Sequence, residues 1–186
     1  MKFKKIICSA LIAAGIFSSF ATTAFAADAN TEDRKISIVW SYSTSSFQFI
    51  KENGKEGIQT SSDYDWKGNS SKVFFKYTSA SGGNIDVQTR AISASGVARG
   101  DSFLYSETTN YTYNPSTGKI VNFARCTPGK NYGISSLIYE KGEKYTDGKK
   151  YATLMVKSSA INYGTGEGWW SPDSSQTHNT PTYLNS

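Results

Sequence analysis

The sequence predicts an all-β fold, an antiparallel β-sandwich or a barrel-like sheet of about eight short strands. Residue types that favour strands are abundant, with 12 Tyr, 10 Phe and 4 Trp among 186 residues. Apolar and polar residues alternate in several short runs, as they do in half-buried strands, and no long apolar repeat of helical period follows the N-terminal segment. Turn-forming residues separate these runs at intervals of about 8 to 15 residues.

The first half of the predicted domain contains several such runs. They span residues 35–40, 47–50, 72–77 and 85–92. Since side chains alternate across a strand, the first run places Ile36, Ile38 and Trp40 on one face. The stretch 79–84 is rich in Ser and Gly and lies between the last two runs, so we expect a β-hairpin over residues 72–93.

Shorter runs continue through the second half of the domain. They span residues 111–113, 119–123, 134–139, 151–156 and 160–163. The segment 114–118 (N-P-S-T-G) has the residues of a tight turn, and Asp147-Gly148 is the strongest turn pair of the chain's later part. The last run continues through three glycines into the adjacent tryptophans Trp169 and Trp170.

The N-terminus has the features of a secretory signal peptide. A basic start precedes the apolar stretch 6–20, which is shorter than the roughly 20 apolar residues of a membrane span. Ala24-Phe25-Ala26 then supplies the small residues that signal peptidase requires, so we expect cleavage after Ala26 and a secreted, extracellular protein without membrane contact. The predicted organisation is a signal peptide over 1–26, a flexible leader over 27–33, a single β domain over 34–175 and a polar tail over 176–186.

The charge of the exported chain argues against nucleic acid as a partner. Removal of the signal peptide takes three lysines with it and lowers the formal net charge from +5 to +2. No dense run of Lys and Arg remains, whereas nucleic-acid-binding domains concentrate positive charge on one face.

A single cysteine, Cys126, remains after the predicted cleavage, so no intramolecular disulfide can form. Three interpretations stay open, namely a buried small apolar side chain, half of an intermolecular disulfide and a reactive thiol. The sequence therefore leaves the oligomeric state unknown.

The sequence predicts no catalytic residue, no metal site and no cofactor. The one histidine, His178, lies in the polar tail, where no neighbouring group is expected to hold it as a general base. Asp63 to Gly68 resembles the start of a calcium-binding loop, but Lys67 and Phe74 occupy positions that would need oxygen ligands. A glycan hydrolase is an alternative, and it would need a second carboxylate about 5 to 9 Å from Glu167.

Aromatic side chains are the best candidates for a binding surface. The predicted binding residues are Tyr64, Trp66, Trp169, Trp170 and Asp173. Adjacent residues of a strand point to opposite faces, so one of the two neighbouring tryptophans is expected in the core. The following Ser-Pro-Asp-Ser has the residues of a type I turn, and it equally fits the simple end of the last strand.

Several short motifs resemble those of a family of small exported proteins of Gram-positive bacteria, known only as a domain of unknown function. The motifs lie at 71–76, 137–142, 151–154 and 166–174. Members of this family typically end in G-x-W-S-P-D-S, and this chain reads G-W-W-S-P-D-S over 168–174. The resemblance covers about residues 70 to 175 and implies a secreted β domain; it carries over no catalytic residue.

These observations predict a secreted, non-enzymatic β domain that acts by surface contact outside the cell. Its expected partner is cell-wall glycan or another extracellular protein. Two alternatives remain, a bacteriocin-like or toxin-like antimicrobial protein and a small glycan hydrolase.

Overall fold

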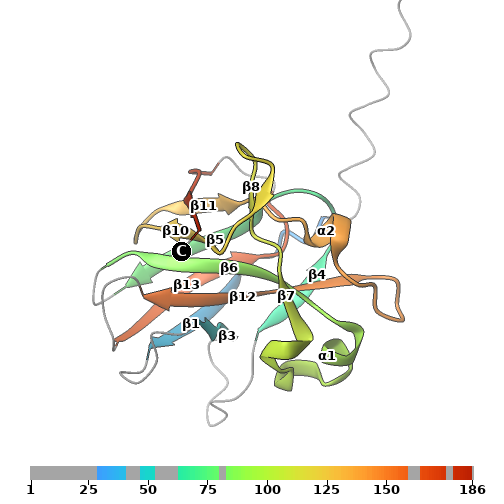
Figure 1. The fold of residues 1–186 in the computed structure, drawn as a ribbon. Helices are drawn as coiled ribbons and strands as arrows, with labels where there is room; N and C mark the ends of the chain where they lie inside the picture. The colour runs from blue at the N-terminus through green and yellow to red at the C-terminus, as the bar shows by residue number, and fades with distance from the viewer. Residues whose placement is uncertain are drawn as a thin grey trace, which may run out of the picture.

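A computed structural model gives the fold of most of the chain (Figure 1). It describes residues 29–40, 47–52, 63–79, 83–158, 164–174 and 178–185. For residues 38–40, 51, 52, 79, 101, 164 and 165 it describes the backbone alone, so the predicted facing of Ile38 and Trp40 lies outside the described side chains. The predicted signal peptide also lies outside the described residues. Strand accounts for 50% of the structure and helix for 12%, in antiparallel sheets packed together, which confirms the predicted fold class.

The first sheet has the strand order β11-β5-β13-β1-β3, and every neighbouring pair in it is antiparallel. Its strands are β1 (Arg34–Trp40), β3 (Lys51–Glu52), β5 (Val73–Ser79), β11 (Asn131–Ile134) and β13 (Gly164–Ser171). The strand that carries both tryptophans, β13, therefore lies in the middle of this sheet. It pairs with β5 on one side and with β1 on the other, where Arg34 lies opposite Trp170.

The second sheet has the order β14-β10-β6-β12-β2, with β4 also paired to β12 and β7 to β6. Its strands are β2 (Gln48–Phe49), β4 (Tyr64–Lys67), β6 (Ile85–Ile92), β7 (Thr108–Asn110), β10 (Phe123–Cys126), β12 (Lys150–Ser158) and β14 (Thr182–Leu184). Outside both sheets, β8 (Tyr113–Asn114) and β9 (Lys119–Ile120) form a hairpin around the predicted turn 114–118. The helical segments are short: α1 (Ala94–Ala98), η1 (Gly100–Ser102), η2 (Tyr105–Glu107) and α2 (Ile138–Lys141).

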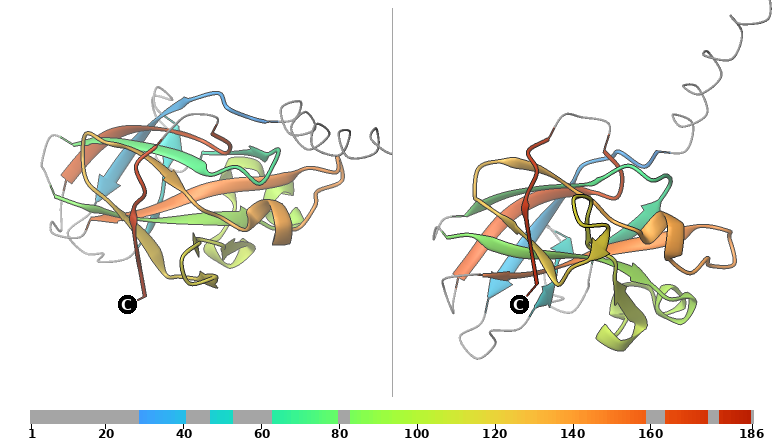
Figure 2. Two further views of the ribbon diagram at one scale, coloured as in Figure 1. Left: turned by 90° about the horizontal axis from the view of Figure 1, so that it is seen from above. Right: turned by 45° about the horizontal axis from the view of Figure 1, so that its top comes forward.

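The apolar core lies between the two sheets, which Figure 2 shows as two stacked layers. Phe75, Tyr77 and Trp170 enter it from the first sheet, and Val87 and Leu154 enter it from the second. Burial of these large side chains is the main favourable term in folding, at about 25 cal/mol per Å² of apolar surface. The core is thus built by the alternating faces that the sequence predicts.

The predicted hairpin over 72–93 is wrong. β5 belongs to the first sheet and β6 to the second, so the two strands lie in different layers and do not pair with each other. The neighbours of β5 are β13 and β11, which come from much later in the chain. The turn signal at 79–84 is compatible with both arrangements, and the placement in different layers lets the apolar faces of the two strands cover each other across the core.

Another run, 134–139, also differs from the prediction. β11 ends at Ile134, and the chain then forms the short helix α2. Ile138 is fully buried in the core, whereas Tyr139 is exposed. The apolar residues of this run therefore divide between the end of a strand and one turn of helix.

Both predicted loose ends are attached to the domain. Asn30 in the leader is buried, and its backbone N–H donates to the Asp173 carboxylate at 2.9 Å. In the tail, β14 pairs with β10 and Tyr183 packs against the core. Within the described part of the chain, no helix has both the length and the apolar character needed to cross a membrane.

Candidate functional site

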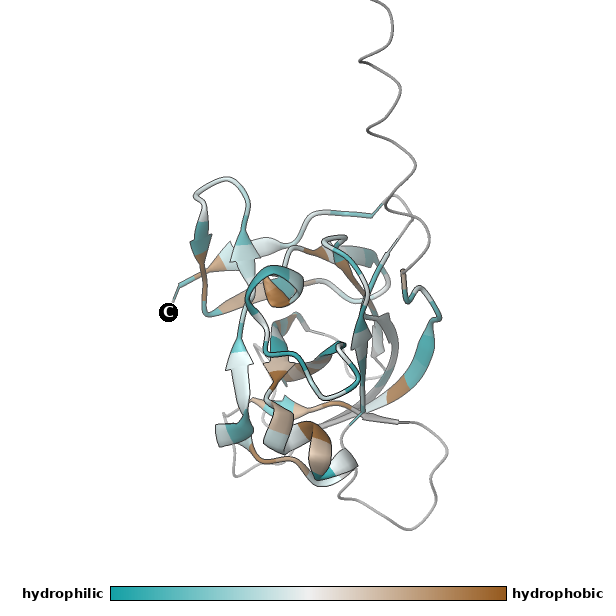
Figure 3. Ribbon diagram, turned by 90° about the vertical axis from the view of Figure 1, so that its right-hand side faces the viewer, coloured by the Kyte–Doolittle hydropathy of each residue, from teal (hydrophilic) through white to brown (hydrophobic). Residues whose placement is uncertain are grey.

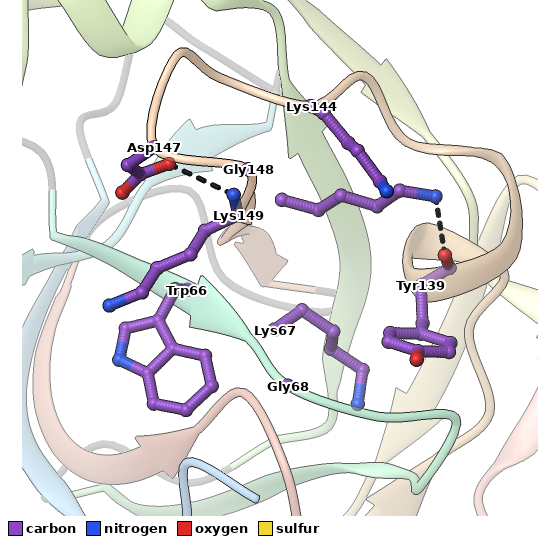
Figure 4. A pocket seen from close by; sticks show the side chains of 9 residues that line it. Trp66, Lys67, Gly68, Tyr139, Lys144, Asp147, Gly148 and Lys149 are labelled. Carbon is purple, nitrogen blue, oxygen red and sulfur yellow. Dashed lines mark hydrogen bonds between the residues drawn. The ribbon is translucent and has the colours of Figure 1, made fainter. Parts of the chain in front are cut away.

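A groove opens where the end of β4, helix α2 and the connection from α2 to β12 meet, and we call it the Trp66 groove (Figure 4). Its volume is about 690 Å³, which is in the range of sites for small organic ligands. It is lined by Trp66, Lys67, Gly68, Tyr139, Lys144, Asp147, Gly148, Lys149 and Lys150.

The connection over 142–149 that forms one wall of the groove is hydrophilic (Figure 3) and is held by local hydrogen bonds. Gly148 has a φ of 80°, as expected for the predicted Asp-Gly turn. The Asp147 carboxylate accepts from the Lys149 backbone N–H at 2.9 Å and from the Tyr151 hydroxyl at 2.8 Å. Burial and this bond to Asp147 raise the pKa of Tyr151 to about 12. These hydrogen bonds hold the turn, and the turn fixes the backbone positions from which the side chains of the following lysines extend.

Two aromatic side chains face the groove from opposite walls. Trp66 is half-buried on β4, which pairs with β12 so that Trp66 lies opposite Tyr151. Tyr139 comes from α2 and is exposed. Figure 4 shows the two rings on opposite sides of the pocket, with the Lys67 side chain drawn between them. This arrangement leaves flat apolar surface open to a ligand.

Lysines surround these rings. The Lys149 ammonium lies 4.7 Å from the centre of the Trp66 ring. The Lys150 ammonium donates to the Tyr139 backbone carbonyl at 2.5 Å and lies 5.9 Å from the Tyr139 ring centre. Partial burial and the nearby charge of Lys144 lower the pKa of Lys150, and Glu140 opposes this. Among the described residues no carboxylate forms an ion pair with Lys144, Lys149 or Lys150, so the groove carries surplus positive charge.

A buried polar network supports the floor of the groove. The Lys67 ammonium pairs with the Asp173 carboxylate and donates to the Ser71 backbone carbonyl at 2.7 Å. Asp173 also accepts from the Gly68 N–H at 2.7 Å and from the Ser71 hydroxyl at 3.1 Å. Burial lowers the pKa of Lys67, and the charge of Asp173 opposes this effect. Lys67 lines the groove, but its ammonium group is bound to Asp173 and to the Ser71 carbonyl in the network beneath the groove.

The same network sets the position of Trp66. Asn30 is held by Asp173, and its side-chain amide donates to the Trp66 backbone carbonyl at 3.0 Å. The Trp66 N–H donates to the Asp65 carboxylate at 2.8 Å. The turn after β13 thus helps to position Trp66, because Asp173 holds Asn30 and Asn30 bonds the backbone of the strand that carries Trp66.

The structure separates the predicted binding residues into different environments. Trp66 is in the groove. Tyr64, two residues earlier on β4, packs against the rings of Phe103 and Tyr151 with centroid distances of 5.8 and 5.7 Å. Trp169 lies on the first sheet, with the ammonium of Lys35 at 5.9 Å and that of Lys76 at 5.4 Å from its ring centre.

Trp170 and Asp173 are interior residues, and both are 0% exposed. The Trp170 indole N–H donates to the Asp63 carboxylate at 2.5 Å. Their interior positions correct the expectation that Trp170 and Asp173 belong to an exposed binding surface. The alternation of the two tryptophans is as predicted, because Trp169 is half-buried and Trp170 is in the core.

The groove is also lined by residues that were not among the predicted binding residues, namely Tyr139, Lys144, Lys149 and Lys150. The Asp-Gly turn and the adjacent lysines were visible signals in the sequence. Only the pairing of β4 with β12 brings them beside Trp66.

The other residues considered for chemistry lie apart from the groove. Glu167 is on the first sheet and pairs with Lys35 at 2.9 Å, with both side chains largely exposed. His178 contacts the Ser174 hydroxyl, and its ring lies 5.1 Å from that of Phe74. Within the described residues, no group of three or more His, Cys, Asp or Glu side chains is placed to hold a metal ion.

Comparison of the chain with protein-family models, curated proteins and solved structures finds no match in any of the three. The resemblance to exported Gram-positive proteins therefore stays a prediction, and the groove is interpreted from its own geometry.

Proposed function

We propose that this protein is a secreted, non-enzymatic domain that binds cell-wall glycan through the Trp66 groove. The observation that carries the proposal is the pair of aromatic rings, Trp66 and Tyr139, on opposite walls of a groove rich in hydrogen-bond donors. Aromatic side chains combine large apolar faces with low conformational cost, which suits them to stack on the apolar faces of sugar rings. Lysine ammonium groups at the rim would donate to hydroxyl oxygens of the same sugars.

A binding role is favoured over hydrolysis by the state of the acids near the groove. Asp147, the carboxylate among the lining residues, is engaged by the Lys149 N–H and the Tyr151 hydroxyl. Glycoside hydrolysis uses two carboxylates that flank the scissile bond. The residues that line the groove include one carboxylate, Asp147, and its hydrogen bonds hold the turn at 147–148.

The test is retention of the purified protein on isolated Gram-positive cell walls, with Trp66→Ala and Tyr139→Ala compared with Trp169→Ala. We expect each groove variant to lose roughly tenfold in affinity, as stacked aromatic contacts do elsewhere, and Trp169→Ala to bind as the parent does. Circular dichroism of all three variants would control for folding. Equal retention of all three, or loss in Trp169→Ala alone, would reject the groove as the glycan site.

Contact with an exported protein is a second candidate, favoured by an apolar cleft on the second sheet. Phe47, Phe49, Tyr105 and Met155 line this cleft, and Tyr105 is 60% exposed. Exposed apolar surface of this kind is typical of protein contact sites. A photo-reactive residue at Tyr105 that crosslinks to a component of the secreted fraction would support it, and the absence of any adduct would count against it.

A further inference from the structure

We propose that the ligand of the Trp66 groove is a phosphate-bearing glycan polymer, an inference that rests on the proposed function and specifies its substrate class. Three properties of the groove favour such a ligand, namely the sign of its charges, the chemical type of its cations and its size.

The sign of the charges favours an anion. Besides Lys67, three lysines line the groove together with one acid, Asp147, on which the charge of Lys149 acts. Lys144 and Lys149 come from the connection 142–149, and Lys150 begins β12. Burial lowers the pKa of Lys150, and the like charge of Lys144 lowers it further, as expected for two ammonium groups that line one groove. Glu140 is the acid whose charge reaches Lys150, and within the described residues it forms no ion pair with any of the three. An anionic group bound between these lysines would relieve their repulsion.

The type of cation fits a phosphodiester. All cationic residues that line the groove are lysines. The planar fork of arginine binds carboxylate and phosphate alike through two parallel hydrogen bonds, whereas lysine binds an anion as a point charge that requires no fixed geometry, as it does in many phosphate sites. A phosphodiester presents its charge in several directions and so suits ammonium groups on flexible stems.

The size and shape of the groove favour a polymer segment. Its volume of about 690 Å³ exceeds the need of a single phosphate and is in the range of sites for drug-sized molecules. The Lys149 ammonium lies 4.7 Å from the Trp66 ring centre, so a stacking surface and a cation are adjacent. A sugar or polyol unit would contact the rings while its flanking phosphates meet the lysines.

The experiment measures binding of the purified protein to three soluble polymers by titration calorimetry: poly(glycerol phosphate), polygalacturonate as a carboxylate polymer and dextran as a neutral glycan. The test variant is Lys144→Gln/Lys149→Gln. The matched control is Lys119→Gln/Lys130→Gln, which removes the same charge from exposed positions outside the groove. Lys150 is left unchanged because its ammonium donates to the backbone carbonyl of Tyr139 in α2.

We expect poly(glycerol phosphate) to bind more tightly than either other polymer, with an affinity that falls as salt rises. The test variant should lose roughly fivefold in affinity for it, since exposed ion pairs contribute about 0.5 kcal/mol each, and the control variant should lose less than twofold. Preference for polygalacturonate or dextran, or equal loss in both variants, would overturn the inference.

Failure of the phosphate inference can be distinguished from failure of the proposed glycan binding. If the protein is retained on walls stripped of phosphate polymers and Trp66→Ala abolishes that retention, glycan binding stands and the phosphate inference is rejected. If the protein binds neither walls nor any of the three polymers, both are rejected.

Discussion

Lys67 and Asp173 form an ion pair in which both side chains are 0% exposed. The pair joins the end of β4 to the turn that follows β13, across two different sheets. The Ser71 hydroxyl and the backbone N–H groups of Asn30 and Gly68 also donate to the carboxylate. The Ser-Pro-Asp-Ser segment is therefore an internal anchor that fastens the leader and the groove strand to the rest of the domain.

Replacing Asp173 by Asn should destabilise the protein strongly. The substitution leaves the buried Lys67 ammonium without its counter-charge, and loss of one partner of a buried pair costs about 3 to 5 kcal/mol. Urea unfolding followed by circular dichroism would measure the change. The double variant Lys67→Met/Asp173→Asn should recover part of the loss, since no unpaired charge remains; a double variant no more stable than Asp173→Asn would contradict this account.

The two adjacent tryptophans should respond differently to truncation. Trp170→Ala empties a fully buried site and leaves the Asp63 carboxylate without an indole donor, so we expect a loss of about 3 to 5 kcal/mol in unfolding free energy. Trp169→Ala removes a half-buried ring beside Lys35 and Lys76 and should cost about 1 kcal/mol. Denaturant midpoints of the two variants test this directly, and similar losses in both would refute the difference in environment.

Cys126 should be unreactive in the folded protein. Its side chain is 0% exposed, and burial raises the pKa of the thiol, so little thiolate forms at neutral pH. A chromogenic disulfide reagent at pH 8 should label the folded chain lacking residues 1–26 only slowly, and one thiol per chain after unfolding in urea. Rapid labelling without denaturant, or a dimer on a non-reducing gel, would favour the reactive or intermolecular alternatives.

His178 should make the folded state less stable in mild acid. Burial lowers the pKa of its imidazole, and the charge of Lys72 lowers it further, while Asp33 opposes them. The unfolded chain, with a histidine pKa of about 6.5, then binds more protons than the folded chain, so stability is lost as pH falls from 6.5 toward the folded pKa. Unfolding free energies at pH 7.5 and pH 5 should differ more in the parent than in His178→Gln. An identical pH dependence in both proteins would exclude this contribution.

Strand positions with a strong alternating pattern were predictable from the sequence. The run 85–92 coincides with β6, the run 151–156 lies within β12, and the run 72–77 overlaps β5 from Val73 onward. In contrast, β4 and β14 are only 4 and 3 residues long, too short for an alternating pattern to stand out in the sequence. They form because β12 and β10 offer them free edges and because their polar side chains find partners there, as Lys67 does in Asp173.

The candidate site was predictable only in its aromatic member, Trp66. The sequence also showed that Trp169 and Trp170 would face opposite ways, but it did not tell which of them would be buried. That choice depends on which face of β13 meets the second sheet. It places Trp170 between the layers, where its N–H reaches Asp63.

The sequence by itself determined the β class, the turns at 114–118 and 147–148 and the alternating faces of the long strands, because each depends on residues a few positions apart. The tertiary structure decided which strands share a sheet, that Asp173 is an internal anchor and that Trp66 meets Tyr139 and the lysines of the α2–β12 connection. These depend on contacts between residues as far as 143 positions apart, such as Asn30 with Asp173. Such contacts form only when two apolar sheet faces pack against each other, and local patterns do not encode which partner a polar side chain will meet.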